Sequence, residues 1–337
     1  MASGQYGPRM TATVTVPVGV ARAPRTLAAP TAVLAVAAPV ALVLALWLPV
    51  GTAVLGLAAF GILHNALELR YVVGRFEGIL AGPFLWLCLA LITGVAACRL
   101  AGPGAGPRAA EIVLCYALLF AACWRAWRDR PARLAAAGVA VVAAALVSLS
   151  FPGYHFVVLA HLHNVVPLVF LWAWSADAGR GRAAFRAVNL AWVLALPALL
   201  LAGAFDAALR AAPVGGFTVQ RLAAAYTPPA WLDGRLALRF LAVFAFLQTM
   251  HYVVWLAVFP RYAPDAAARF DARVPALRGG RVWLVGLAVG AVFAGIFAWD
   301  YASGRTLYAS LASYHAYLEF PVLLALILRL RPEGARP

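Results

Sequence analysis

Ten long apolar stretches constrain this chain more than any other feature of its sequence. A helix that crosses a bilayer needs about 20 mainly apolar residues, since the hydrocarbon offers no water to an unpaired backbone group. Charged residues make up 12% of the chain, against about 25% in soluble domains. The sequence therefore predicts an all-α fold, a polytopic integral membrane helical bundle of about ten transmembrane helices in the cell (cytoplasmic) membrane. The expected spans are 27–48, 51–70, 79–98, 110–126, 134–151, 154–175, 187–205, 236–259, 282–300 and 308–328.

The arginines predict how this bundle is oriented. All 27 basic residues are arginines, and with the N-terminus inside, 20 of them fall on the inner side and 7 on the outer side. This bias is the positive-inside pattern. Both termini are therefore expected to be cytoplasmic, in tails 1–26 and 331–337 that flank a single bundle over 27–330. The long extracytoplasmic loop 206–235 is amphipathic, and we expect it to be a lid or to lie in the membrane interface.

The basic residues also exclude some functions. A chain without lysine cannot form a Schiff base through a lysine side chain. Nucleic acid is not an expected partner, because the arginines lie at the ends of the spans rather than on one face. The lipid bilayer is the partner that the composition predicts.

All six histidines fall inside or at the edge of the apolar stretches: His64, His155, His161, His163, His251 and His315. Ionisable side chains are costly in hydrocarbon, so they are rarely found there without a partner or a function. Glu68 follows His64 by four residues and Glu319 follows His315 by four, and this spacing places each pair on one helix face. Such a pair is typical of metal ligands or of a proton relay.

The even-numbered spans carry these groups, so four helices that run in the same direction can present imidazoles at a similar depth. We predict a shared metal site with the ligands His64, Glu68, His163, His251, His315 and Glu319. The alternative for each histidine alone is a hydrogen-bonded contact between helices. Glu68 alone could pair with a nearby arginine, whereas Glu319 has no arginine near it in sequence and needs a cation, a metal or a proton.

The sixth span is expected to line the site, although His161 and His163 point about 200° apart on an ideal helix. Either one could be the ligand, and Pro167 is expected to kink the helix nearby. Tyr252, Tyr314 and Tyr317 flank histidines and could orient them or belong to the interfacial aromatic belt. The residues predicted to contact the ligands or the substrate are His155, His161, Asn164, Gln248, Asn65 and Tyr314.

Imidazole with carboxylate suits iron, zinc or manganese, and the four cysteines show no spacing typical of a thiolate site. Iron in such a site leaves positions open for O₂. We therefore expect one or two Fe²⁺ ions per chain, with zinc or haem as alternatives. The predicted function is a non-haem iron oxygenase or a desaturase-like oxidoreductase that acts on a lipophilic substrate, with a possible redox partner.

At these residues the chain resembles the Brp/Blh family of membrane β-carotene dioxygenases. The first motif of that family, a histidine followed by Gly-Ala-Leu-Asp, is similar to the segment from His64 to Glu68, with Asn65 in place of the glycine and Glu68 in place of the aspartate. The later family histidines correspond to His163, His251 and His315. The resemblance implies an iron oxygenase that acts on a polyene. The composition is also similar to that of membrane proteins from actinobacterial natural-product clusters, which implies a role in natural-product biosynthesis.

Two other functions fit the same residues. Two histidines on different helices could bind haem, as in a membrane haem or quinone electron-transfer protein. An intramembrane chain of His and Glu could also serve a proton- or metal-coupled transporter, although the sequence has no inverted repeat. No catalytic residue is assigned by the sequence beyond the predicted ligands.

Overall fold

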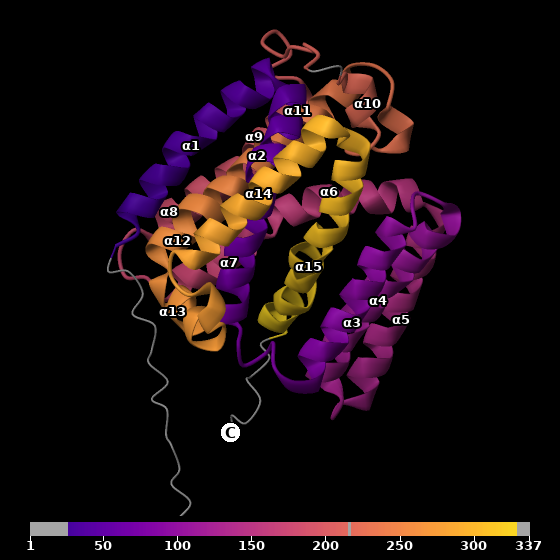
Figure 1. The fold of residues 1–337 in the computed structure, drawn as a ribbon, viewed down its shortest axis with the longest axis vertical. Coiled ribbons are helices and arrows are strands. Elements are labelled where there is room, and N and C mark those ends of the chain that lie inside the picture. The colour runs from indigo at the N-terminus through magenta and orange to yellow at the C-terminus, as the bar shows by residue number, and fades with distance from the viewer. Residues whose placement is uncertain (1–25, 215–216, 329–337) are drawn as a thin grey trace, which may run out of the picture.

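The computed structural model describes residues 26–214 and 217–328, which form helices and two isolated β-bridges (Figure 1). Within these described residues, ten segments are long and apolar enough to cross a membrane, which confirms the expected all-helical fold and the number of apolar helices. This composition is typical of a multi-pass membrane protein. Except for Thr26, the predicted tails 1–26 and 331–337 lie outside the described residues, so the orientation of the termini stays a prediction.

The ten segments match the expected spans in order, with different ends. They are α1 (Ala28–Trp47), α2 (Pro49–Arg75), α3 (Gly82–Leu100), α4 (Ala105–Trp127), α5 (Pro131–Ser150), α6 and α7 (Pro152–Val165 and Pro167–Trp174), α8 and α9 (Arg182–Leu190 and Leu196–Ala202), α11 and α12 (Arg235–Val253 and Phe259–Tyr262), α14 (Arg281–Trp299) and α15 (Tyr301–Ile327). The tenth begins seven residues earlier than the expected 308, because Asp300 caps it by accepting a hydrogen bond from the Ala302 amide.

Prolines break three of the spans. The sixth is interrupted at Val166, directly before Pro167, as the sequence predicts. Pro167 has no N–H to donate and its ring crowds the carbonyl of His163, four residues earlier. Single π-helical turns precede Pro197 and Pro260 (residues 191–195 and 254–258). The second of these turns begins three residues after His251, and π-bulges of this kind are frequent at functional sites.

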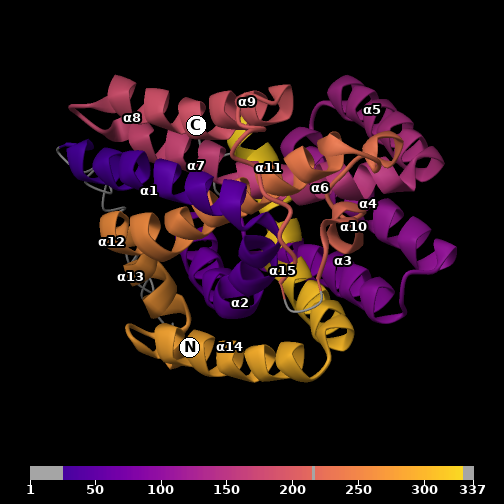
Figure 2. The same ribbon diagram turned by 90° about the horizontal axis from the view of Figure 1, so that it is seen from above.

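Helices α2, α11 and α15 occupy the centre of the bundle, and the other spans surround them (Figure 2). Gly61 allows α15 to approach α2 closely, because a Cβ at this position would lie 2.7 Å from the Tyr308 ring. At the periphery, α5 has no buried residue. An apolar helix without buried side chains suits a face that is turned toward lipid.

Two short helices cover opposite ends of the bundle (Figure 1). In the predicted loop 206–235, α10 (Val219–Ala223) packs Leu222 into one apolar cluster with Val50 and Leu241. At the other end, α13 (Pro264–Arg273) is held to α2 by Asp271, which accepts two hydrogen bonds of 2.8 Å from Arg70. The loop is therefore packed on the spans over part of its described length.

Candidate metal centre

Four histidines from four helices meet at the centre of the bundle. His64 on α2, His163 on α6, His251 on α11 and His315 on α15 lie near the middle of their spans. The ring centroids are 5.2 Å apart for His64 and His251, and 5.0 Å for His64 and His315. His163 lies 4.6 Å from His251 and 4.9 Å from His315 by the same measure. The imidazoles therefore contact one another directly.

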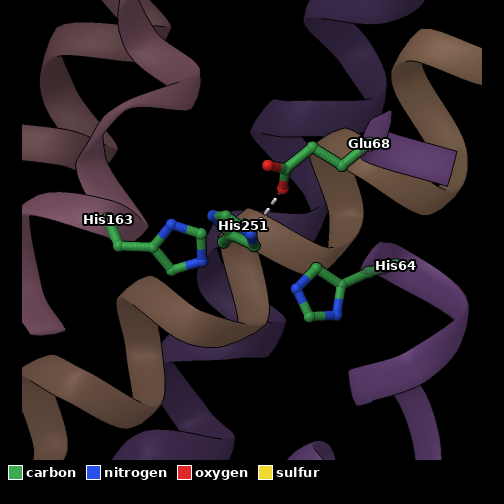
Figure 3. A group of neighbouring side chains, drawn as sticks. All are labelled: His64, Glu68, His163 and His251. Carbon is green, nitrogen blue, oxygen red and sulfur yellow. Dashed lines mark ion pairs between the residues drawn. The ribbon is translucent and has the colours of Figure 1, made fainter. Parts of the chain in front are cut away.

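The ligand atoms of this group are close enough for a single ion. One side-chain nitrogen or oxygen from each of His64, Glu68, His163 and His251 lies within 4.8 Å of the other three (Figure 3). Two ligands bonded to one ion at about 2.1 Å are at most about 4.2 Å apart, so the side chains would have to move closer together around an ion. The Nε2 atom of His315 lies 3.2 Å from that of His163, close to the ~3.3 Å between two ligands of a tetrahedral ion.

The two carboxylates pair with histidines of other helices. Glu319 on α15 contacts His163 on α6, with 2.8 Å between Oε2 and Nδ1. Glu68 on α2 lies 3.5 Å from His251 on α11, measured between Oε2 and Nε2 (Figure 3). As expected, the spacing of four residues places each glutamate on the same helix face as the histidine that precedes it. Each glutamate nevertheless contacts a histidine of another helix. Both carboxylates are fully buried.

Hydrogen bonds hold two of the imidazoles in orientations suited to a ligand. His64 Nδ1 lies 3.1 Å from the backbone carbonyl of Phe60, and a proton on this nitrogen leaves Nε2 free to accept. The Nδ1–H of His163 likewise donates to Glu319, so its Nε2 carries the lone pair and meets Nε2 of His315 at 3.2 Å. Histidines that bind metals almost always donate their other ring N–H to a carbonyl or a carboxylate in this way.

Several polar atoms of the cluster have no hydrogen-bond partner although they are buried. They are both carboxylate oxygens of Glu68, Oε1 of Glu319, both ring nitrogens of His251 and Nδ1 of His315. A buried polar atom without a partner costs free energy, so such atoms are uncommon, and here six of them meet at one place. Unpaired imidazole nitrogens and carboxylate oxygens are the donor set that a divalent transition metal needs. The residues therefore fit a metal ion.

The other predicted residues of the sixth span lie outside this cluster. His161 Nε2–H donates to the backbone carbonyl of Tyr226, at 2.7 Å, and thus faces the loop 206–235. His155 Nδ1 lies 3.1 Å from Ser148 Oγ on α5. Asn164 donates to the carbonyl of Ala160 on its own helix. His163 is thus the histidine of this span that lies in the central cluster, whereas His161 faces the loop.

Three more residues were predicted to contact the ligands or the substrate. Gln248 donates to the Tyr252 hydroxyl at 2.8 Å, and the Tyr252 ring lies 4.6 Å from the His64 ring, so Gln248 reaches a histidine through the tyrosine. Asn65 is buried next to His64 and interacts with Tyr308. Tyr314 shares a hydrogen bond of 2.9 Å with Thr93 on α3 rather than with a histidine.

A second buried polar cluster escaped the sequence analysis. Glu111 on α4 accepts hydrogen bonds from Arg99 on α3 and from Tyr317 on α15. Arg99 was predicted to lie beyond the end of the third span, whereas the structure includes it in α3 with 22% of its side chain exposed. The sequence does contain a signal for this cluster, because Glu111 lies in an apolar stretch 12 residues after Arg99. Residues at this separation flank the turn between two antiparallel helices and can therefore face each other.

Comparison with protein-family models, with curated proteins and with solved structures gave no match for this chain. The resemblance to the Brp/Blh family therefore stays a prediction. The function of the chain is inferred from the composition of its helices and from the geometry of the His/Glu cluster.

Proposed function

We propose that this chain is an integral membrane non-haem metalloenzyme, an iron-dependent oxygenase or desaturase-like oxidoreductase that acts on a lipophilic polyene or lipid. The observation that carries the proposal is that His64, Glu68, His163 and His251 place their donor atoms within 4.8 Å of one another at the centre of an apolar bundle, with His315 and Glu319 in contact with His163. Iron in a site of this kind supplies the redox chemistry that activates O₂. His64, Glu68, His163, His251 and His315 would hold the ion.

The charge of the cluster supports a single divalent ion. Glu68 and Glu319 carry two negative charges when ionised, and among the described residues neither is hydrogen-bonded to an arginine. One Fe²⁺ balances both charges, which matters because an uncompensated charge is costly in an apolar interior. Two divalent ions would leave a positive excess that the described side chains do not offset. We therefore expect one iron per chain.

The residues around the ion have separate roles in this proposal. The Phe60 carbonyl and Glu319 fix the tautomers of His64 and His163, so that their Nε2 lone pairs face the ion. His163 has 18% of its side chain exposed, whereas His64 and His315 are 2% exposed and His251 is fully buried. A lipophilic substrate would therefore reach the ion from the side of α6, directly from the bilayer.

Haem is a poorer fit to the same residues. Two axial imidazoles bind haem from opposite faces, so the macrocycle separates their rings. Here the rings of His163 and His315 touch, with 3.2 Å between their Nε2 atoms. A haem would have to displace this contact and both buried carboxylates.

O₂ consumption by the Fe²⁺-loaded protein in nanodiscs tests the function. We expect uptake of O₂ on addition of a carotenoid, a linear polyene or an unsaturated lipid. The product should carry ¹⁸O₂ label or, when ascorbate is added to supply the two electrons that desaturation requires, a new double bond. Metal-free protein, zinc-loaded protein and His251→Ala are expected to be inactive. The iron-loaded protein could instead turn over no member of this panel and move protons or metal ions across vesicle membranes. That result would reject the enzyme and favour the transporter.

A further inference from the structure

The cluster of Arg99, Glu111 and Tyr317 joins three helices beside the candidate metal centre. The Nε and Nη2 atoms of Arg99 donate to Glu111 Oε1 at 2.9 and 2.7 Å, and the Tyr317 hydroxyl donates to the same oxygen at 2.7 Å. Arg99 Nη1 donates to the backbone carbonyl of Ala309 at 2.8 Å. Arg99 and Glu111 thus hold α15 at two positions, Ala309 and, about two turns further on, Tyr317.

The positions of these contacts relate directly to the metal ligands on α15. Tyr317 lies between His315 and Glu319 in sequence, two residues from each, so its side chain projects about 200° away from both. Tyr317 is fully buried against α3 and α4, while His315 and Glu319 face α2, α6 and α11. Because a helix turns as a unit, fixing Tyr317 on one face fixes the direction of the two site residues on the other.

The free energy needed to bury this ion pair indicates that the cluster does more than stabilise the packing of the helices. An ion pair between apolar helices loses its hydration, and the attraction of the pair often does not repay that loss. What the pair supplies instead is direction, because a guanidinium donates in a fixed plane and Glu111 Oε1 accepts from both Arg99 and Tyr317.

We propose that Arg99, Glu111 and Tyr317 are positioning residues that set the rotation of α15, and thereby the placement of His315 and Glu319 at the metal site. The inference rests on the proposed metal centre. Changes to groups that orient metal ligands typically cost about 10- to 100-fold in metal affinity. The three residues act one step further from the ion, so we expect the lower end of this range.

Titration of the metal-free full chain in detergent with Co²⁺ tests the inference. Tyr317→Phe removes the hydrogen bond from α15 to Glu111, keeps the one from Arg99 to Ala309 and leaves no charge unpaired. Arg99→Lys keeps the charge beside Glu111 but loses the planar fork. We expect both variants to bind Co²⁺ about 10-fold more weakly than wild type, with a changed visible spectrum at saturation. Tyr116→Phe is the matched control, because Tyr116 on α4 makes a 2.8 Å hydrogen bond to Ser148 and none to α15.

The outcomes separate the inference from the proposed function. Wild-type affinity and an unchanged spectrum in both variants would overturn the positioning role while leaving the metal centre intact. A lower melting temperature with an unchanged saturated spectrum would also overturn it, since loss of general stability does not alter the ligand geometry. Wild-type protein that binds no Co²⁺ would reject the metal centre and the positioning role together. If Tyr317→Phe does not fold, the spectrum of Arg99→Lys decides.

Discussion

Two buried polar clusters lie on opposite faces of α15, and they differ in how completely their hydrogen bonds are made. In the cluster of Arg99, Glu111 and Tyr317, no buried polar atom lacks a partner. In the His/Glu cluster, six buried atoms lack one. A satisfied cluster is complete in the protein alone, whereas an unsatisfied one has donor and acceptor atoms left for a metal ion, a proton or water. This difference identifies the His/Glu cluster as the candidate site.

The largest effect is expected from breaking the satisfied cluster. Arg99→Met leaves Glu111 buried with one remaining hydrogen bond, from Tyr317, and no compensating charge. We expect a loss of about 3 kcal/mol in the free energy of unfolding, the lower end for a broken buried pair because part of Arg99 is exposed. Reversible unfolding in mixed micelles measures it. A loss below the error of the method would mean that the cluster adds nothing to stability.

The next largest effect is the stabilisation of the protein by a metal ion bound at the His/Glu cluster. A ligand present at about 100 times its Kd stabilises the folded state by about 2.7 kcal/mol. We expect Fe²⁺ or Co²⁺ to raise the melting temperature of wild type, and a chelator to reverse the rise. His64→Ala with His251→Ala should show no response. An equal response in this double variant would place the metal elsewhere.

Replacing a glutamate by glutamine should change the free energy of unfolding by a smaller amount, with opposite signs in the two clusters. In metal-free protein, Glu68→Gln removes a carboxyl group whose charged form is disfavoured by full burial and by the nearby Glu319, so we expect unchanged stability or a gain of about 1 kcal/mol. Glu111→Gln leaves Arg99 without its counter-charge and should destabilise the protein. Paired unfolding curves of the two variants measure the difference. The same sign for both would remove the distinction between the clusters.

The smallest effect on stability is expected at the half-buried ion pair of Asp206 and Arg239, which offers a contrast to both clusters. The hydrogen bond from Arg239 holds the pKa of Asp206 below its usual value of about 4. The pair therefore stabilises the folded state above that value and loses its effect as the pH falls through the lowered pKa. Asp206→Asn should melt slightly below wild type at pH 7 and level with it at the acidic end of the titration. A constant difference across this range would contradict the assignment.

The sequence predicted the ten apolar helices because hydropathy is a local property of each stretch. It also predicted His163, His251 and Glu319 as members of one site, because ionisable residues stand out in apolar helices. The sequence could not predict the partners of the carboxylates, since Glu319 contacts His163 on a helix more than 150 residues away in sequence. Arg99 was overlooked because an arginine at the end of a span is normal at a membrane surface, and only the packing of α3 on α15 reveals its role.

The metal content of the purified protein tests the central claim most directly. Wild type, His315→Ala with Glu319→Ala, and the control His155→Ala would be purified without chelator, incubated anaerobically with Fe²⁺ and desalted, followed by elemental analysis and an optical spectrum. We predict one iron per chain and no Soret band for wild type and for His155→Ala, and loss of the iron in the double variant. Folded wild-type protein that retains no metal after this treatment would contradict the metal centre.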